Sequence, residues 1–214
     1  MLLLSLDFAF SLNNFTLFDC DKKEVKLIFG ENSGRKSLEI FPAVFETLGV
    51  DPRSVEAFAV NLGVGYSTGL RIAVSMAKTY AQISSKPLIT YTSCEALLSF
   101  LPLKGTYLVL FKVSRYLVGG VWRKDNNLPE GIEYPIILNG ENFERITAEV
   151  DGIVMPHSVE EAFRNTFKVD GVKVITLKNE VLSLGGAFIS CEKLKKGLLS
   201  DPIKTEPLYF RPPV

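Results

Sequence analysis

Apolar and polar positions alternate through the first part of the chain in a pattern that predicts strands joined by short turns. Three segments show this alternation and are separated by polar residues: residues 2–9, 14–19 and 24–30. Their close succession predicts an antiparallel meander. A helix, a short helical turn and an apolar strand are predicted to follow: residues 37–50, 51–56 and 57–63.

A second group of elements follows a break near residues 99–106, where Pro102 and Gly105 interrupt the pattern. We predict three further strands and two helices: residues 107–114, 116–122, 151–155, 158–167 and 179–199. The tail, residues 201–214, is rich in proline and is predicted to be extended.

The order of these elements indicates a fold class. Strand–strand–strand–helix–strand–helix is the order of one RNase H-like half, and two such halves make an actin-like or sugar-kinase-like protein. We therefore expect an α/β chain with the two-lobed actin-like (ASKHA, RNase H-like) fold. The first lobe would comprise residues 1–101 and a smaller second lobe residues 102–214, with the tail able to pack back on the first lobe.

A glycine-rich loop, residues 61–69, leads into a helix that is more apolar than one core requires. A single polar stripe runs along residues 70–83 of this helix: Arg71, Ser75, Lys78 and Gln82. The stripe is roughly 60° wide and leaves an apolar arc of roughly 220°, whereas ~100° is enough to cover one core. Either the helix is sandwiched within its own fold, or a second face, with Met76 and Tyr80 as anchors, meets another subunit.

The same loop and helix carry a sequence signature. The segment GVGYSTGLRIA, residues 63–73, resembles the G-P-G-S-F-T-G-L-R-I-G signature of the TsaB (YeaZ) family. The matching positions are Gly63, Gly65, Thr68, Gly69, Leu70, Arg71 and Ile72. The departures are Val64, Tyr66, Ser67 and Ala73. An ungapped match of this length at a strand–helix junction is far more specific than a lone pair of glycines.

Other segments resemble the family more weakly, in the family's order along the chain. Three motifs are matched in part: I-L-A-I-D-T-S by Leu4 and Asp7, H-S-E-x-L-L-P by Ser37, Ile40, Phe41 and Pro42, and P-x-Y-L-R by Pro207, Tyr209 and Arg211. Lys36 replaces the histidine of the second motif. Of the family's D-A-R only Arg115 remains, with Val113 in place of the aspartate. The chain thus resembles a divergent member of the family over almost its whole length.

This resemblance implies a role in assembly. TsaB proteins are the non-catalytic dimerisation subunits of the bacterial machinery that attaches threonylcarbamoyl to the adenosine beside the tRNA anticodon. The resemblance implies a heterodimer with a TsaD-type catalytic subunit, joined by a TsaE-type ATPase, with TsaC supplying threonylcarbamoyl-adenylate. Alone, the chain is expected to form a homodimer, because a large apolar patch seldom stays exposed. It would meet tRNA only through the complex.

The family arrangement implies that the partner interface lies on the helix after the glycines. The expected interface residues are Gly63, Gly65, Tyr66, Thr68, Gly69, Leu70, Arg71, Ile72, Met76, Thr79, Tyr80 and Ile83. In the tail, Tyr209 and Arg211 are candidate anchors to the body of the protein, and a simple extended tail fits the sequence equally well.

The first hairpin is a poor candidate for holding phosphate. Actin-like ATPases hold nucleotide phosphates with a D-x-G-T/S hairpin, whose glycine lets the backbone approach them closely. Here that position reads Asp7-Phe8-Ala9-Phe10, and the later loop lacks the phosphate-loop pattern because Leu70 follows Gly69. We therefore expect no nucleotide cofactor, glycines that permit close packing, and a structural hydrogen-bonding role for Asp7. The alternative is a nucleotide-dependent transferase or kinase of the same superfamily.

Composition and charge narrow the remaining classes. The chain has 214 residues, of which 47% are hydrophobic and 22% charged, a globular composition. Lys+Arg and Asp+Glu both number 24, and this balance disfavours a direct RNA-binding module. The apolar start lacks a basic segment and is interrupted by Asp7, so we interpret it as a strand and expect a cytoplasmic protein with no membrane contact.

Histidine and cysteine are scarce. His157 is the only histidine, which excludes a two-histidine metal site, and it is predicted to be exposed in a loop. Cys20, Cys94 and Cys191 are odd in number, widely spaced and without a C-x-x-C pattern. We therefore expect neither a disulfide nor a zinc site, and a reducing compartment. No metal and no catalytic residue are expected.

Overall fold

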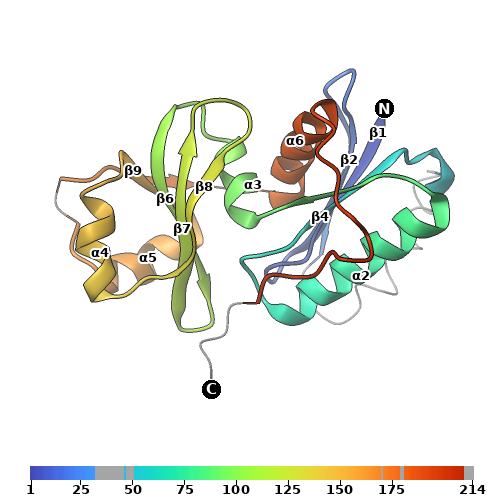
Figure 1. Cartoon of the computed structure of the whole chain (residues 1–214). Helices are drawn as coiled ribbons and strands as arrows, with labels where there is room; N and C mark the ends of the chain where they lie inside the picture. The colour runs from blue at the N-terminus through green and yellow to red at the C-terminus, as the bar shows by residue number, and fades with distance from the viewer. Residues whose placement is uncertain (32–45, 47–50, 170, 179–180, 210–214) are drawn as a thin grey trace.

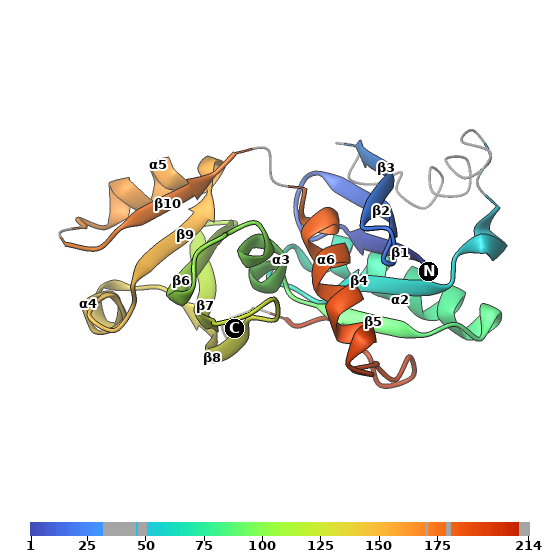
Figure 2. The same ribbon diagram turned by 90° about the horizontal axis from the view of Figure 1, so that it is seen from above.

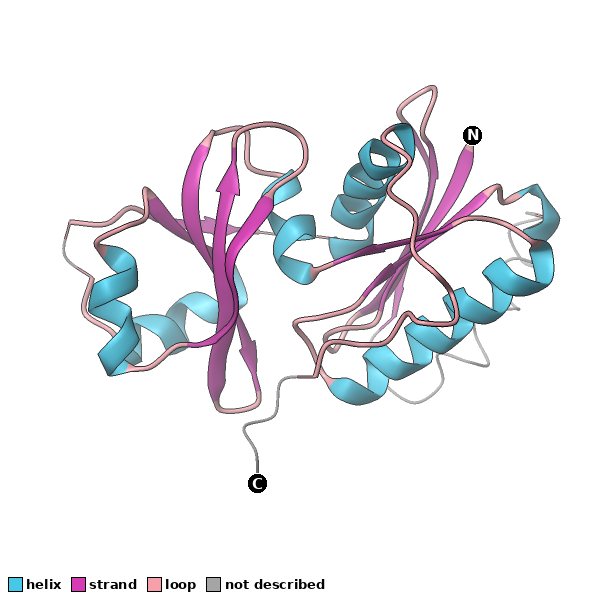
Figure 3. Ribbon diagram, viewed as in Figure 1, coloured by secondary structure: helices cyan, strands magenta, loops and turns pink. Residues whose placement is uncertain are grey.

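The structure is a computed structural model that describes residues 1–31, 46, 51–169, 171–178 and 181–209. It has two lobes side by side, each built on a five-stranded sheet with helices packed against it (Figure 1). Strands and helices are mixed in both lobes (Figure 3). The predicted α/β, two-lobed architecture is confirmed. The predicted helix 37–50 and the motif residues from Lys36 to Pro42 lie outside the described residues, apart from the helical Glu46.

The first sheet has the strand order β3-β2-β1-β4-β5. Its strands are β1 (Leu2–Asp7), β2 (Asn13–Asp19), β3 (Glu24–Glu31), β4 (Ala57–Asn61) and β5 (Leu88–Tyr91). The first three strands pair antiparallel, which confirms the predicted meander. β4 and β5 then continue the sheet in parallel to β1, and the short 3-10 helix Pro52–Ser54 precedes β4.

Helices cover both faces of the first sheet. On one face lies α2 (Ser67–Ser84), and on the other lie α3 (Ser93–Ser99) and α6 (Leu182–Lys195) (Figure 2). Strand β1 supplies apolar side chains to both faces of the sheet, because successive side chains of a strand point to opposite sides. Leu4 and Leu6 join the cluster under α2, whereas Leu3 joins the cluster under α6.

The second sheet has the strand order β10-β9-β6-β7-β8. Its strands are β6 (Gly105–Val113), β7 (Tyr116–Lys124), β8 (Glu130–Ile137), β9 (Gly152–Pro156) and β10 (Val174–Leu177). Helices α4 (Gly140–Thr147) and α5 (His157–Thr166) cover its outer face. Its inner face, through Tyr107, Val109 and Phe111, joins the same cluster as α3 and α6, so the two lobes share one hydrophobic core.

The end of the chain returns to the first lobe. Helix α6, which the sequence-based division assigned to the second lobe, packs on β1, β2 and α3. A disulfide between Cys20, just after β2, and Cys191 in α6 ties the two elements together. The expectation of no disulfide is therefore wrong, because the fold brings together two cysteines that lie 171 residues apart in sequence.

Candidate functional site

Asp7, at the end of β1, is the most buried carboxylate near the junction of the lobes. It is 1% exposed and accepts hydrogen bonds from the Ala9 amide (3.0 Å) and from Asn61 Nδ2 (2.6 Å). Asn61 Nδ2 also donates to Ser93 Oγ (2.8 Å). Burial raises the pKa of Asp7 to about 6, although the two hydrogen bonds act in the opposite direction. The predicted role of Asp7 as a structural acceptor is confirmed.

The glycine loop packs directly against the first hairpin. A Cβ atom on Gly69 would lie 1.9 Å from the Phe8 carbonyl oxygen, and one on Gly65 would lie 2.4 Å from the Ala9 carbonyl oxygen. The Tyr66 amide donates to the same Ala9 oxygen at 2.6 Å. The glycines thus let the start of α2 touch the hairpin backbone, which confirms the close packing predicted for them.

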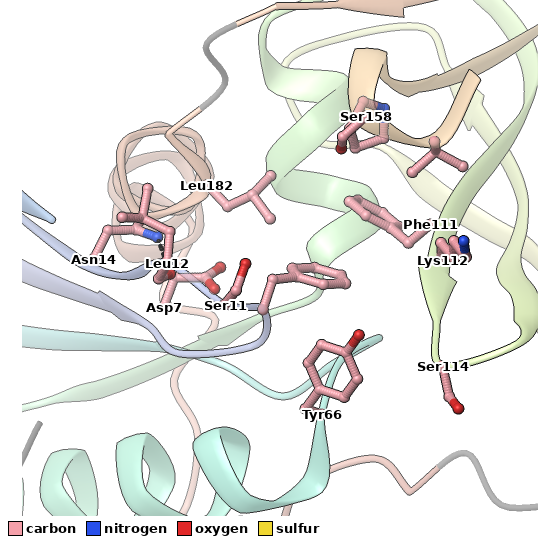
Figure 4. A pocket seen from close by; sticks show the side chains of 13 residues that line it. Asp7, Ser11, Leu12, Asn14, Tyr66, Phe111, Lys112, Ser114, Ser158 and Leu182 are labelled. Carbon is pink, nitrogen blue, oxygen red and sulfur yellow. Dashed lines mark hydrogen bonds between the residues drawn. The ribbon is translucent and has the colours of Figure 1, made fainter. Parts of the chain in front are cut away.

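A cleft of about 470 Å³ lies between the lobes (Figure 4). The side chains that line it come from the first hairpin, β6 and the first residues of α5 and α6: Asp7, Phe10, Ser11, Asn14, Phe111, Lys112, Ser158 and Leu182 among them. Phe10 stacks on Phe111 across the lobes, with ring centroids 5.0 Å apart, and meets the edge of Tyr66 at 6.4 Å. Aromatic rings therefore occupy the part of the cleft that faces the hairpin.

The cleft offers limited chemistry. Lys112 is an exposed cation, and Ser11, Ser114 and Ser158 supply hydroxyl groups. The Ala9 amide, which a phosphate-binding hairpin would direct at its ligand, already donates to Asp7. The arrangement can hold a small polar molecule between aromatic walls, but its hairpin has no backbone donor free at Ala9.

Helix α2 buries some of the expected interface residues within its own lobe. Met76 is 8% exposed and Leu70 is fully buried, and both pack into the core of the lobe. Ile72 and Tyr80 are partly buried against the same cluster, and Tyr80 stacks on Phe58 with centroids 5.9 Å apart. Met76, which was expected at the partner interface, is therefore buried in the core of its own lobe and does not face outward.

Part of the predicted interface set does remain exposed. Tyr66 is 44% exposed and Ile83 is 81% exposed, and Thr68, Arg71 and Thr79 are exposed as well. Gly63 and Gly65 are buried in the loop that precedes the helix. The interface assignment therefore stays a prediction for the exposed residues. Thr68, Arg71 and Thr79 lie on or beside the polar side of α2, whereas Ile83 lies on its apolar arc.

The tail forms a strap, residues 201–209, along that polar side (Figure 1). Lys78 Nζ donates to the carbonyl oxygens of Ile203 (3.3 Å) and Thr205 (2.9 Å). Arg71 Nε donates to the Tyr209 hydroxyl (3.1 Å), and the guanidinium lies 5.0 Å from the centre of that ring. The Leu208 amide donates to the Leu62 carbonyl oxygen. Tyr209 thus anchors the tail to the first lobe, and Arg211 lies outside the described residues.

The contacts that join these parts could not be predicted from the sequence. Asn61 and Ser93 have no distinguishing pattern around them that marks them as partners of Asp7. One nearby signal does exist, because the T-x-x-E pattern of Thr92 and Glu95 predicts the capping box that begins α3 just before Ser93. The Phe10–Phe111 stack and the Lys78 contacts to the strap join segments far apart in sequence. Only a tertiary structure reveals them.

The structure also bears on the expectations about metal sites and membrane spans. His157 begins α5 instead of lying in a loop; it is exposed, with Nδ1 3.3 Å from Glu160 Oε2. In the described part of the chain, no three His, Cys, Asp or Glu side chains are grouped to hold a metal ion. None of the described helices has both the length and the apolar character of a membrane span.

Comparisons with known proteins agree on the architecture. The family model for TsaD, tRNA N6-adenosine threonylcarbamoyltransferase, matches residues 31–109. No curated protein sequence matches the chain significantly. An uncharacterized Pseudomonas aeruginosa protein with similarity to peptidase YeaZ aligns with a TM-score of 0.74 and 15% identity, over 98% of this chain and 99% of that one.

Two further solved structures show the same architecture. YeaZ from Pseudomonas aeruginosa aligns with a TM-score of 0.70 and 14% identity, over 97% of this chain and 100% of that one. An inorganic polyphosphate/ATP-glucomannokinase from Arthrobacter aligns with a TM-score of 0.52 and 13% identity, over 90% and 99%. Over nearly its whole length, the chain therefore shares the fold of these YeaZ structures, an actin-like, RNase H-like fold.

Proposed function

We propose that the chain is a non-catalytic scaffold subunit that binds and supports a TsaD-type catalytic subunit in the synthesis of N6-threonylcarbamoyladenosine in tRNA. The observation that carries this proposal is the state of the first hairpin. Its Ala9 carbonyl accepts from Tyr66, its Ala9 amide donates to Asp7, and Gly69 presses on the Phe8 carbonyl. The backbone groups of Ala9 are already hydrogen-bonded within the chain, so the hairpin is suited to support a helix rather than a phosphate group.

The partner-binding part of the proposal is supported by the surface of α2. Thr68 and Arg71 belong to the family signature and are exposed, so packing within the chain does not account for both. The same surface would serve for self-association when the chain is alone. A TsaE-type ATPase would join the heterodimer, and tRNA would be bound through the complex.

Co-purification with the TsaD homologue of the same organism tests this function. We expect a stable one-to-one complex that survives gel filtration, and no tight binding of ATP by the isolated chain in calorimetry. Failure of the two proteins to associate at micromolar concentration, with both folded, would contradict the proposal.

A second candidate is a nucleotide-dependent transferase or kinase. The inter-lobe cleft of about 470 Å³ and the likeness to a glucomannokinase favour it. This alternative requires ATP binding at low micromolar Kd that is lost in Lys112→Ala, since Lys112 is an exposed cation lining the cleft. The hairpin argues against it, because its Ala9 amide already donates to Asp7 and is not free for a phosphate group.

A further inference from the structure

A second hollow lies on the other side of Tyr66, between the start of α2, the β6–β7 turn and the strap. It measures about 290 Å³. Three tyrosines, Tyr66, Tyr116 and Tyr209, stand at its rim together with Leu208, and Val118 and Ile137 contribute to its apolar lining. Tyr66 and Tyr209 are 44% and 50% exposed. We call this feature the tyrosine hollow.

Two arginines flank the tyrosine hollow and are held by its rings. Arg71 lies over Tyr209, and Arg115 lies over Tyr116, each guanidinium carbon 5.0 Å from the ring centre. Arg71 Nε donates to the Tyr209 hydroxyl and Arg115 Nη2 to the Tyr116 hydroxyl. Stacking fixes the orientation of each guanidinium, so less conformational entropy is lost when it binds a further group.

Neither arginine has a carboxylate partner in the described part of the chain. Helix α2 carries two cations, Arg71 and Lys78, and no acidic residue. The nearest acidic residue of the strap to Tyr209 is the exposed Glu206, which pairs with neither arginine. Each guanidinium therefore keeps N–H groups free in the planar arrangement that binds a carboxylate through two hydrogen bonds.

We propose that the tyrosine hollow and its two arginines bind an acidic segment of the catalytic subunit, with an apolar or aromatic side chain in the hollow and carboxylates on Arg71 and Arg115. This inference rests on the proposed function and names the chemistry of the partner's contact. Tyrosine and arginine around an apolar pocket are the residues in which interface binding energy concentrates. The strap is part of the binding surface, since it supplies Tyr209 and Leu208.

Charge reversal tests the proposal in the full chain with the TsaD homologue of the same organism as the probe. Arg71→Glu and Arg115→Glu are each expected to weaken Kd about 10-fold or more, and the double variant about 100-fold, because each replaces an attraction to carboxylate by a repulsion. Arg123→Glu is the matched control. Arg123 is also exposed, but it lies at the opposite end of the β6–β7 ladder, and its variant should bind within about two-fold of wild type.

A second variant separates the ring from the charge. Tyr209→Ala removes the support of Arg71 and one rim of the hollow, whereas Tyr209→Phe keeps the ring and loses only the hydroxyl contact. We expect the alanine variant to weaken binding about 30-fold and the phenylalanine variant to weaken it about three-fold. Thermal melting of each variant checks that the fold is retained. We expect melting temperatures near that of the wild type, because the altered side chains are exposed.

Different outcomes overturn different parts. No binding by the wild-type chain would overturn the proposed function, and this inference with it. Normal binding by the wild type and equally by the double arginine variant would overturn the inference alone. Loss of tRNA binding in the double variant, with the protein complex intact, would assign the hollow to RNA instead. Conversion of a homodimer to a monomer, again with the complex intact, would assign it to a second copy of the chain.

Discussion

Single residues decide how closely the glycine loop and the first hairpin can approach. The hairpin lacks the glycine of phosphate-binding actin-like ATPases. Its backbone groups instead hydrogen-bond with Asp7 and Tyr66 and contact Gly69. Single variants at two residues of this contact should have measurable effects. Gly69 has no room for a side chain, and Asp7 is buried away from solvent.

Gly69→Ala should destabilise the protein although alanine is the better helix former. Its Cβ would lie 1.9 Å from the Phe8 carbonyl oxygen, so backbone must move, and we expect a loss of about 2–3 kcal/mol in the free energy of unfolding. Gly140→Ala, at the start of α4, is the control, because its Cβ meets nothing within 4 Å. Urea denaturation measures both. A Gly69→Ala variant as stable as the wild type would contradict the close packing.

Asp7 should make stability fall as pH rises through the weakly acidic range. Its pKa is raised from 3.8 when unfolded to about 6 when folded, so the folded state binds the proton more tightly. The contribution is complete below pH 3.8 and is lost progressively up to about pH 6. The loss amounts to about 3 kcal/mol at most. The difference in unfolding free energy between the wild type and Asp7→Asn should change by up to this amount between pH 3.5 and 7; parallel curves would refute the prediction.

At the scale of elements, the hydrophobic periodicity of α2 does not determine which of its faces pack within the chain. Its wide apolar arc fits both a sandwiched helix and an interface helix. Met76 is buried in its own lobe, whereas Ile83 on the same arc is 81% exposed. The polar stripe holds the strap, through Arg71 and Lys78. The exposed surface of α2 thus comprises the region beside the strap and, at Ile83, part of the apolar arc.

Substitutions on the two sides of α2 should behave differently. Met76→Asp places an unpaired charge in the core and is expected to unfold the protein at 37 °C, since such burial costs several kcal/mol. Thr79→Asp, on the exposed side, should melt near the wild-type temperature. Circular dichroism melts check both. If Met76→Asp stays folded, the helix is not sandwiched as the structure has it.

The sequence predicted the strands of the meander, β4, α2, β6, β7, β9, α5 and α6 because each has a clear period or a clear boundary. It did not yield β5, α3, α4 or β10, which are short, or β8, whose residues are mostly exposed and lack alternation. It also did not yield the place of α6, which depends on contacts with β1, β2 and α3 that are far away in sequence. The candidate site was harder to predict from the sequence than the fold. The motif indicated the glycine loop and α2 as the candidate interface, but which signature residues face solvent depends on contacts with the sheet and the strap.

For the whole molecule, one covalent link joins early and late parts of the chain. Cys20 and Cys191 enclose most of the sequence, and both are buried at the contact of β2 with α6. The wide spacing that made a disulfide improbable is also what makes it effective, because a crosslink that closes a longer loop restricts the unfolded chain more.

Reduction of this disulfide should lower stability without changing the fold. Loop-closure entropy for a crosslink of this length corresponds to about 5 kcal/mol. We expect a lower melting temperature in reductant, and the same lower temperature for the Cys20→Ser/Cys191→Ser variant with or without reductant. If reductant lowers the melting temperature of that double variant too, the disulfide is not the cause.

The return of α6 to the first lobe also has a consequence for synthesis on the ribosome. The first sheet, made from residues 2–91, lacks the helix that covers its inner face until Leu182–Lys195 has been translated. The second lobe, whose strands run from Gly105 to Leu177, is in effect inserted between two parts of the first. A nascent chain must therefore carry an uncovered apolar sheet while the inserted lobe emerges, and it becomes a candidate for chaperone binding during that interval.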